Sequence, residues 1–477
     1  MSQKKLIVVV KQSCQTCQLV EPVLQQLQTQ GLLSAVYSQD DPAFPADINC
    51  VVDDSDLHQS WQRNIEIVPT LIHLDGDREI ERSEGWDRQQ WAALAGVAEL
   101  GAALPVSRPG CASKSIDPGM EEKLNIRFAG DGLEARRVAL GEDEDEMEAM
   151  FNRGWSDGLP LVPPTPERVL RMLKGTCRAP HEIVGQVPPD LVNCTVEKVA
   201  VNAVMAGCKP EYMPVVLAAV EAALSEKFCM HGVLATTMFC GPIVIVNGPV
   251  TEAIGMNWSH NALGQGNRAN AAIGRALQLL IRNVGGGKPG EIDRSALGSP
   301  GKYTFCFAED ETDSFWTPLA QERGATVGSS AVTVFAGEGV QGVVDQKARG
   351  PEALTASFAA SLLAVSNIKS AMAGDAILVV CPEHVNVYRE AGWDKARLHS
   401  ELASRLMRDG EELIAGAHNI DEGLPAWVAG KQIPKFKPGG LMIVRAGGDA
   451  GKFSAILSGW GASGDVGSSP VTWELSE

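Results

Sequence analysis

The stretch Ser13-Cys14-Gln15-Thr16-Cys17 decides how the front of this chain folds. It follows the apolar run 6–10 and opens a helical pattern of apolar residues, so it marks a junction between a strand and a helix. The N-terminus of a helix carries a partial positive charge, which favours thiolate over thiol. A Cys-x-x-Cys at such a junction indicates a redox-active disulfide: Cys14 attacks as the nucleophile, and Cys17 resolves the mixed disulfide.

Around this stretch, residues 1–97 alternate short apolar runs with helical patterns. Strands are expected at 33–37, 48–52, 67–74 and 78–83, and helices at 56–64 and 87–97. Strands that alternate with helices are typical of an α/β fold. The sequence therefore predicts a compact α/β unit over residues 1–97.

This unit resembles thioredoxin in three features that follow one another along the chain. They are the Cys-x-x-Cys, the segment Val68-Pro69-Thr70 before a strand, and Gly85 before the last helix. The resemblance implies that Pro69 is cis, lies against the dithiol and leaves a backbone edge free to pair with a client peptide. It also implies that a cellular thiol reductant or thioredoxin reductase recharges the dithiol.

The dithiol itself departs from the family's pattern, because Ser-Cys-Gln-Thr-Cys stands where thioredoxins carry Trp-Cys-Gly-Pro-Cys. Without a proline between the cysteines, the family's reduction potential is not carried over. Two other interpretations stay open. One is a degenerate thioredoxin fold used only for docking, and the other is a cysteine pair that binds a soft metal such as Zn, Cu or Hg.

Length, composition and charge limit the class of protein. At 477 residues the chain is too long for one hydrophobic core, so two or three domains are expected. Its 44% hydrophobic and 21% charged residues are ordinary for a soluble globular protein. The formal net charge of -18 argues against nucleic acid or an anionic membrane as a partner, because both need a basic surface.

Cysteine usage and the first residues favour a cytoplasmic protein. The 11 cysteines, an odd number at scattered spacings, do not form the framework of a secreted disulfide-rich protein. Two lysines and a short apolar run near residue 1 do not make a signal peptide, and no apolar run of 18 residues occurs. We therefore expect mostly reduced thiols, no membrane contact and a cytoplasmic location.

Behind the front unit we expect a linker and a larger domain. Pro and Gly break any regular pattern in 98–125, which is interpreted as the linker. Cys111 on this segment could shuttle electrons between domains, although an incidental surface thiol is the favoured interpretation. Residues 126–477 are expected to form a large α/β domain. Its stretch 327–333 recurs as 466–472, which hints at two related halves, about 126–340 and 341–477.

Three phrases in the large region resemble a bacterial family associated with UGSC-type (seleno)proteins. They are Gly-Trp-Ser-Asp-Gly-Leu-Pro at 154–160, Ala-Val-Met-Ala-Gly-Cys-Lys-Pro-Glu-Tyr at 203–212, and Pro-Glu-His at 382–384 with a following Gly-Trp. The resemblance would cover most of residues 150–477 and implies thiol or selenol redox chemistry. It brings no settled reaction with it.

Cys208 and Cys229 are the candidate client thiols of the large domain. Cys208 follows a helix end and precedes Lys209, which predicts a partly exposed thiol whose pKa the lysine lowers. The negative end of the helix opposes that shift, and core packing is the alternative. Cys229, His231 and Cys240 form a mixed cluster that could bind Zn or Fe, create a His-assisted thiolate, or simply lie in the core.

Polar residues at strand ends and in loops outline a candidate small-molecule site. Asn247 follows a buried strand, at the carboxyl end where α/β folds bind ligands. His260, between Asn257 and Asn261, could act as a general acid or base, with a structural histidine as the alternative. The glycine-rich turn before Arg268 opens a helix whose N–H groups could cradle an anion.

Two further stretches carry residues typical of binding sites. Glu383 and His384, at the end of another expected strand, are the matching candidates in the second half. The run 447–452 is similar to a phosphate-binding loop, but Ala446 and Phe453 replace the glycine and the Ser/Thr that such a loop needs, so a tight turn is expected.

Together these features predict an oxidoreductase in which the dithiol reduces Cys208 or Cys229 of the large domain. That thiol would act on a small molecule near Asn247, His260 and Arg268, and reductive cleavage of a carbon–sulfur or carbon–heteroatom bond suits the design. The residues indicate no cofactor other than the Zn or Fe that the cluster around Cys229 could bind, and a homo-oligomer is left open. The alternatives are a soft-metal-handling protein and a metal-dependent lyase or hydrolase with an accessory thioredoxin domain.

Overall fold

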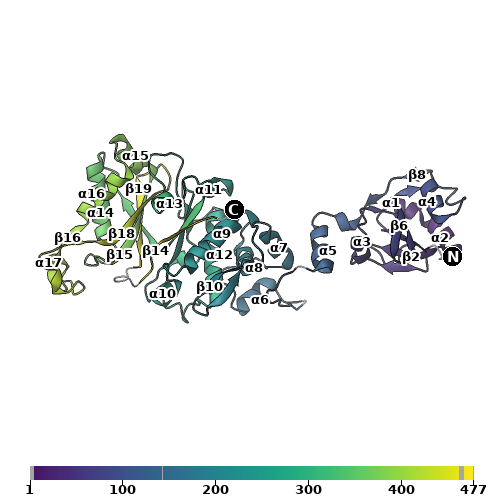
Figure 1. Ribbon diagram of the computed structural model, residues 1–477, viewed down its shortest axis with the longest axis horizontal. Coiled ribbons are helices and arrows are strands. Elements are labelled where there is room, and N and C mark those ends of the chain that lie inside the picture. The colour runs from purple at the N-terminus through teal and green to yellow at the C-terminus, as the bar shows by residue number, and fades with distance from the viewer. Residues whose placement is uncertain (1–4, 131, 142, 461–466, 476–477) are drawn as a thin grey trace. The chain divides into compact units, whose positions relative to one another are not determined.

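The computed structural model describes residues 5–130, 132–141, 143–460 and 467–475. The chain forms two compact units, Met1–Gly132 and Leu133–Glu477 (Figure 1). Both units combine helices with sheets, so the protein is α/β, as the sequence predicts. Within the described residues, no helix is both long and apolar enough to cross a membrane.

The front unit is built on a five-stranded sheet in the order β3-β2-β1-β5-β6. Strand β1 is apolar on both faces, and the fold buries it between parallel β2 and antiparallel β5. Helix α4 starts at the capping carboxylate of Asp87 and ends at Gly96, whose φ of 70° suits glycine. The elements are β1 (Lys5–Val10), α1 (Gln15–Leu19), α2 (Glu21–Thr29), β2 (Leu33–Ser38), β3 (Val51–Asp53), α3 (His58–Gln62), β4 (Ile67–Val68), β5 (Thr70–Asp75), β6 (Arg78–Glu84), β7 (Trp86–Asp87), α4 (Arg88–Ala95), β8 (Ser107–Arg108), β9 (Cys111–Ala112) and α5 (Met120–Ala129).

Residues 98–125 are folded onto the front unit and are not a free linker, which corrects the sequence-based interpretation. Strand β8 pairs with β7, and β9 pairs with β4, where Cys111 lies opposite Val68. Proline and glycine interrupt long helices and strands, but they do not prevent two-residue strands from satisfying the backbone. Gly110 is required at this contact, since a Cβ there would come within 2.6 Å of the Val68 carbonyl oxygen.

The second unit contains a seven-stranded sheet in which β13-β12-β14-β19-β15-β18 follow one another and β20 also pairs with β14. Helices and two small two-stranded sheets, β10-β11 and β16-β17, surround it. The elements are α6 (Glu146–Asn152), α7 (Pro166–Leu173), β10 (Ile183–Val187), β11 (Val192–Thr195), α8 (Val196–Ala206), α9 (Met213–Leu224), α10 (Met230–Ala235), β12 (Gly241–Asn247), α11 (Val250–Ala253), α12 (Arg268–Gly285), β13 (Cys306–Ala308), α13 (Leu319–Glu322), β14 (Ala331–Val344), α14 (Pro351–Leu363), β15 (Gly374–Val380), α15 (Pro382–Glu390), α16 (Lys395–Arg405), β16 (Met407–Asp409), α17 (Gly410–Leu413), β17 (Gln432–Pro434), β18 (Phe436–Arg445), β19 (Phe453–Gly459) and β20 (Val471–Glu474).

Two parts of this sheet have the same strand arrangement. Strand β12 has a parallel neighbour, β13, and an antiparallel neighbour, β14. Strand β15 likewise has parallel β18 and antiparallel β19, and the antiparallel pair β14–β19 joins the two sets. The recurring heptapeptides run into β14 and β20, which pair with each other. Val466 of the second heptapeptide lies outside the described residues.

The sheet curls until its two edge strands approach each other. Just after β13, the Asp310 N–H donates to the carbonyl oxygen of Arg445, the last residue of β18, over 2.7 Å. The carboxylate of Asp310 and the guanidinium of Arg445 also pair at 2.9 Å. The inner face is one apolar cluster with side chains from six strands. Members are Ile243, Phe307, Phe335, Ile377, Val444 and Leu457.

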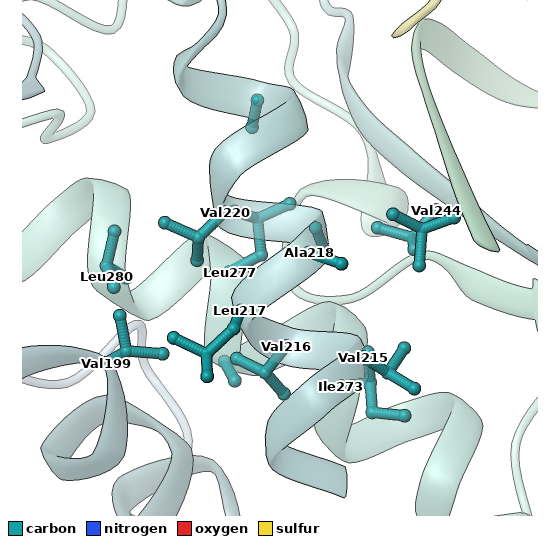
Figure 2. Packing of buried hydrophobic residues seen from close by; sticks show 14 of the residues in the cluster. Val199, Val215, Val216, Leu217, Ala218, Val220, Val244, Ile273, Leu277 and Leu280 are labelled. Atoms are coloured by element: carbon teal, nitrogen blue, oxygen red, sulfur yellow. The ribbon is translucent and has the colours of Figure 1, made fainter. Parts of the chain in front are cut away.

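The outer face of the sheet is covered by two groups of helices. Helices α8, α9 and α12 pack on the β12–β14 side, and Figure 2 shows Leu217 and Val220 of α9 beside Leu277 and Leu280 of α12. Helix α9 carries one charged residue, Glu221, and is buried on nearly every side. Helices α14, α15 and α16 cover the β15–β18 side. Alternate residues of each strand therefore enter the inner cluster and one of the helical layers.

The apolar loop 154–160 is held against α12 by an ion pair. The Arg275 guanidinium donates to both carboxylate oxygens of Asp157, each over 2.8 Å. The same guanidinium donates to the carbonyl oxygens of Leu159 and Pro160, each over 3.1 Å. Both charged side chains are mostly buried, so the pair is a fixed anchor for a loop that has no regular hydrogen-bonded structure.

We expect Arg275→Met to loosen this loop and to destabilise the second unit by about 1.5–3 kcal/mol, because a charged hydrogen-bond network is lost and Asp157 keeps a poorly hydrated charge. Hydrogen exchange of peptides that cover 154–160 measures the effect locally. Exchange as slow as in the unmodified protein would show that the anchor contributes nothing.

Candidate functional site

The dithiol lies where β1 passes into α1, as the sequence predicts. Cys14 is the N-cap of α1, and its sulfur accepts the Cys17 N–H over 3.4 Å. The Cys17 sulfur in turn accepts the Lys11 N–H over 3.4 Å. Both cysteine side chains are completely buried. The turn therefore fixes the two sulfurs side by side and shields them from water.

The two sulfurs differ in protonation. A hydrogen bond from the Cys17 thiol lowers the pKa of Cys14 to about 5, and a hydrogen bond from Cys111 acts in the same direction. Burial opposes this shift but is outweighed. Burial, and the hydrogen bond to Cys14, raise the pKa of Cys17 far above its usual range. At neutral pH the pair is therefore one thiolate and one thiol, which is the arrangement that thiol–disulfide exchange needs.

We expect the thiolate absorbance of the reduced protein to titrate near pH 5, because Cys14 binds its proton only below its lowered pKa of about 5. The signal is present above that pH and is lost as the pH falls through it. Ultraviolet difference spectra of the protein and of Cys14→Ser measure it. A first titration step near the ordinary thiol value of 9.0 would contradict the assignment.

The Pro69 peptide is cis, and the sulfur of Cys14 lies 3.5 Å from the carbonyl oxygen of Val68, the residue before it. The thioredoxin resemblance implies a free backbone edge at this point. The structure corrects that expectation, since β9 of the same chain pairs with β4 and occupies the edge. An external peptide can pair there only if the chain's own segment leaves.

Cys111, which the sequence analysis assigned to the linker, lies beside the dithiol. Its sulfur lies 2.8 Å from the sulfur of Cys14, and its side chain is half-buried. Burial and the neighbouring Cys14 raise the pKa of the Cys111 thiol. The two cysteines are separated by 97 positions in the chain, so no local motif joins them. The available signal was a cysteine directly after Pro109-Gly110.

Cys208 is buried, whereas the sequence predicts a partly exposed thiol. After α8 the chain turns at Gly207 with a φ of 84°, and the Cys208 N–H donates to the Ala203 carbonyl over 2.9 Å, which carries the side chain into the core. Burial, only partly offset by Arg268, raises the pKa of the Cys208 thiol to about 12. Arg268 itself donates to the Gly207 carbonyl over 2.9 Å.

Cys229, His231 and Cys240 differ in their surroundings. Cys229 is half-buried and precedes α10, His231 is exposed on that helix, and Cys240 is buried before β12. Burial raises the pKa of Cys240 to about 12. No three His, Cys, Asp or Glu side chains are grouped to hold a metal ion in the part of the chain that the structure describes. The expected Zn or Fe donor set is therefore not found among these residues.

Asn257, His260 and Asn261 come together in one loop, as the sequence predicts. The Asn257 amide donates to the His260 carbonyl over 2.8 Å, and the Asn261 amide donates to the Gln265 carbonyl over 2.6 Å. His260 is exposed, with its Nε2 atom 3.3 Å from the carboxylate of Asp449. These amides hold the loop in shape, and the imidazole remains open to solvent.

Asn247 lies at a different place and is buried at the end of β12. Its amide nitrogen donates to the carboxylates of Glu309 and Glu311, each over 2.8 Å. Burial raises the pKa of Glu309, although Lys395 and these hydrogen bonds oppose the shift. Asn247 therefore holds the acidic segment after β13, and its amide nitrogen is fully used there.

A cysteine–histidine pair follows β15, where the sequence drew attention only to Glu383 and His384. Cys381 is the N-cap of α15, and its N–H donates to the Ser454 hydroxyl over 3.1 Å. His384 Nδ1 lies 2.7 Å from the same hydroxyl. Burial raises the pKa of Cys381, but hydrogen bonding and charge from His384 outweigh it and lower that pKa. Both side chains are buried, so the thiol has a lowered pKa but is shielded from solvent.

Two of the cavities in the second unit have none of Asn247, His260 and Arg268 in their lining. One of about 700 Å³ is mainly apolar, with Trp155 and Met205 beside Arg136 and Lys198. The other, of about 450 Å³, is lined by Cys240, Lys302 and Tyr303 among others. The predicted small-molecule residues are thus not gathered around either cavity.

No protein-family model matches this chain, and no curated protein matches it. Among solved structures it is similar to thioredoxin O2 from Arabidopsis thaliana in the oxidized state. That similarity has 19% identity and a TM-score of 0.16, and it covers 20% of this chain and 76% of that chain.

Proposed function

We propose that the front unit is a thiol–disulfide oxidoreductase in which Cys14 is the attacking thiolate and Cys17 the resolving thiol. The observation that carries the proposal is the geometry of the buried pair: Cys14 caps α1, and its sulfur accepts the N–H of the buried Cys17 over 3.4 Å. The lowered pKa of Cys14, about 5, and the raised pKa of Cys17 agree with it. Such a pair keeps a nucleophile ready at neutral pH and holds a second electron donor in contact with it.

The reaction is two successive exchanges. The Cys14 thiolate attacks one sulfur of a disulfide, forms a mixed disulfide and releases the other sulfur as a thiolate. The Cys17 thiol then gives up its proton and attacks Cys14, which closes the Cys14–Cys17 disulfide and releases the second thiolate. The substrate disulfide gains two electrons, and the two cysteines lose two. A cellular thiol reductant or a thioredoxin reductase would restore the dithiol.

Reduction of insulin or oxidised glutathione, with dithiothreitol as the electron source, tests this function. Activity above the dithiothreitol background is expected for the full chain. Activity equal to that background would overturn the proposal for the front unit.

We further propose that this dithiol supplies reducing equivalents to a thiol of the second unit, which acts on a small molecule in the cytoplasm. Fusion in one chain supports this, because it raises the local concentration of the donor to roughly the millimolar range. Of the two client thiols named from the sequence, half-buried Cys229 suits exchange better than buried Cys208. Cleavage of a carbon–sulfur or carbon–heteroatom bond remains the reaction that fits such a thiol best.

The soft-metal and metal-dependent alternatives make a different prediction for metal content. A protein purified without chelators would then carry close to one metal ion per chain, whereas a dithiol oxidoreductase would carry almost none. Elemental analysis of the purified full chain separates these functions.

A further inference from the structure

We infer that Cys111 is a third redox thiol, which forms a disulfide with Cys14 and passes electrons between the buried pair and disulfides in solution. This inference rests on the proposed function of the front unit. It adds to the Cys-x-x-Cys a third catalytic residue, at which a disulfide from solution reacts first.

The position of Cys111 carries the inference. Its sulfur lies 2.8 Å from that of Cys14, and a disulfide bond needs the two atoms to close to about 2.05 Å. Cys14 and Cys17 are completely buried, whereas Cys111 is half-buried. A disulfide in solution therefore reaches Cys111 before it can reach Cys14.

Segment 107–115 holds Cys111 in place, and we call it the strap. On the Cys111 side of the dithiol, Thr16 donates its hydroxyl to the Pro109 carbonyl over 2.8 Å. The Lys11 ammonium donates to the Ala112 carbonyl over 2.7 Å. Farther along, the Ser113 N–H donates to the Glu66 carbonyl over 2.8 Å. These bonds fix Cys111 against Cys14 in advance, so little entropy is lost when the two sulfurs react.

Backbone pairing holds Cys111 beside cis-Pro69. Cys111 lies opposite Val68 in an antiparallel pair, directly before cis-Pro69. Gly110 lets the strap come this close, since a Cβ there would lie 2.4 Å from the Ile67 side chain. The pairing thus holds the strap beside the dithiol, with the Cys111 sulfur in contact with that of Cys14.

The pKa shifts of Cys14 and Cys111 agree with a hydrogen bond between the two sulfurs. Cys111 lowers the pKa of Cys14, and Cys14 raises that of Cys111, so the Cys111 proton lies between the two sulfurs. A thiolate with a pKa of about 5 is too weak a base to remove the proton of Cys111, so Cys14 acts only as the thiolate that attacks the Cys111 sulfur.

The relay balances with a small or peptide disulfide as the oxidant. The Cys111 sulfur attacks one sulfur of that disulfide, forms a mixed disulfide and expels a first thiolate, which takes up the proton that Cys111 loses. The Cys14 thiolate attacks the Cys111 sulfur, forms the Cys14–Cys111 disulfide and expels the second thiolate, which takes the proton of Cys17. Cys17 then attacks Cys14, closes the Cys14–Cys17 disulfide and releases Cys111 as a thiolate. One disulfide has become two thiols, and two cysteines are oxidised.

Trapping the middle step tests the relay. The full chain with Cys17→Ser is reduced, treated with oxidised glutathione and mapped by peptide mass spectrometry after thiol blocking. We expect a Cys14–Cys111 disulfide as the main product. As a control, the same disulfide should form when the half-buried Cys50 is also replaced by serine. Glutathione attached to Cys14 with Cys111 still free would overturn the inference.

A rate measurement separates this inference from the proposed function. Reduction of oxidised glutathione should fall at least about tenfold in Cys111→Ser and Cys111→Ala, and should not change in Cys50→Ser. Full activity in both Cys111 variants would refute the relay while the dithiol function stands. A full chain without activity above background would instead refute the dithiol function.

Discussion

Cys14→Ser should abolish disulfide reduction by this protein, with the rate falling at least about a hundredfold to the dithiothreitol background. A serine hydroxyl is not ionised at neutral pH, whereas the Cys14 thiol is held as thiolate by Cys17 and Cys111. Neither neighbour can replace it, since the pKa values of the Cys17 and Cys111 thiols are both raised. The insulin assay with the reduced full chain measures the loss.

Cys50→Ser is the matched control, because Cys50 is a half-buried cysteine of the same unit whose pKa is raised by burial. It should keep full activity. If Cys14→Ser also kept its activity, neither the dithiol function nor the relay through Cys111 could hold. If turnover of the second unit's own substrate were unchanged after serine replaced both Cys14 and Cys17, the proposed electron transfer between the units would be wrong.

Lys395→Met should destabilise the second unit by about 3–5 kcal/mol, the largest stability loss that we expect from a single charge. Lys395 is buried at the start of α16, with its ammonium 2.8 Å from Glu322 and 3.8 Å from buried Glu309. It also donates to the Thr317 carbonyl over 2.9 Å. Without it, a buried carboxylate keeps its charge with no cation beside it. Denaturation followed by hydrogen exchange in β14 reports the second unit alone.

The pH dependence of this loss follows from Glu309. Burial raises its pKa, and removal of Lys395 takes away an interaction that lowers it. A carboxyl with a raised pKa favours the folded state more as the pH falls, since the protonated form needs no cation. The loss in Lys395→Met should therefore shrink in acid, and the added change Glu309→Gln should recover part of it at neutral pH.

Glu401→Gln provides the control for this ion pair. It removes the partner of Arg405 on the solvent side of the same helix, where a pair contributes only about 0.2–1 kcal/mol. If Lys395→Met cost no more than this control, the buried charges after β13 would not be paired as the structure shows.

The sequence by itself determined the α/β class, most strands of the front unit and the place of the dithiol. These follow from local patterns: an apolar run makes β1, and the Cys-x-x-Cys opens the helix after it. The loop that contains Asn257, His260 and Asn261 was found in the same way, because its members lie close together in the chain. Short-range periodicity and spacing are physical constraints that a single stretch of chain imposes on itself.

Only the tertiary structure decided which cysteines meet and which are hidden. Cys111 reaches Cys14, 97 positions away in the chain, because β9 pairs with β4. Which strand edge a distant strand will pair with is not specified by any local sequence pattern. Cys208 is enclosed because the chain turns inward after α8, and burial then raises the pKa of its thiol. A thiol's reactivity is set by the charges and solvent around it, and those come from residues far away in the sequence.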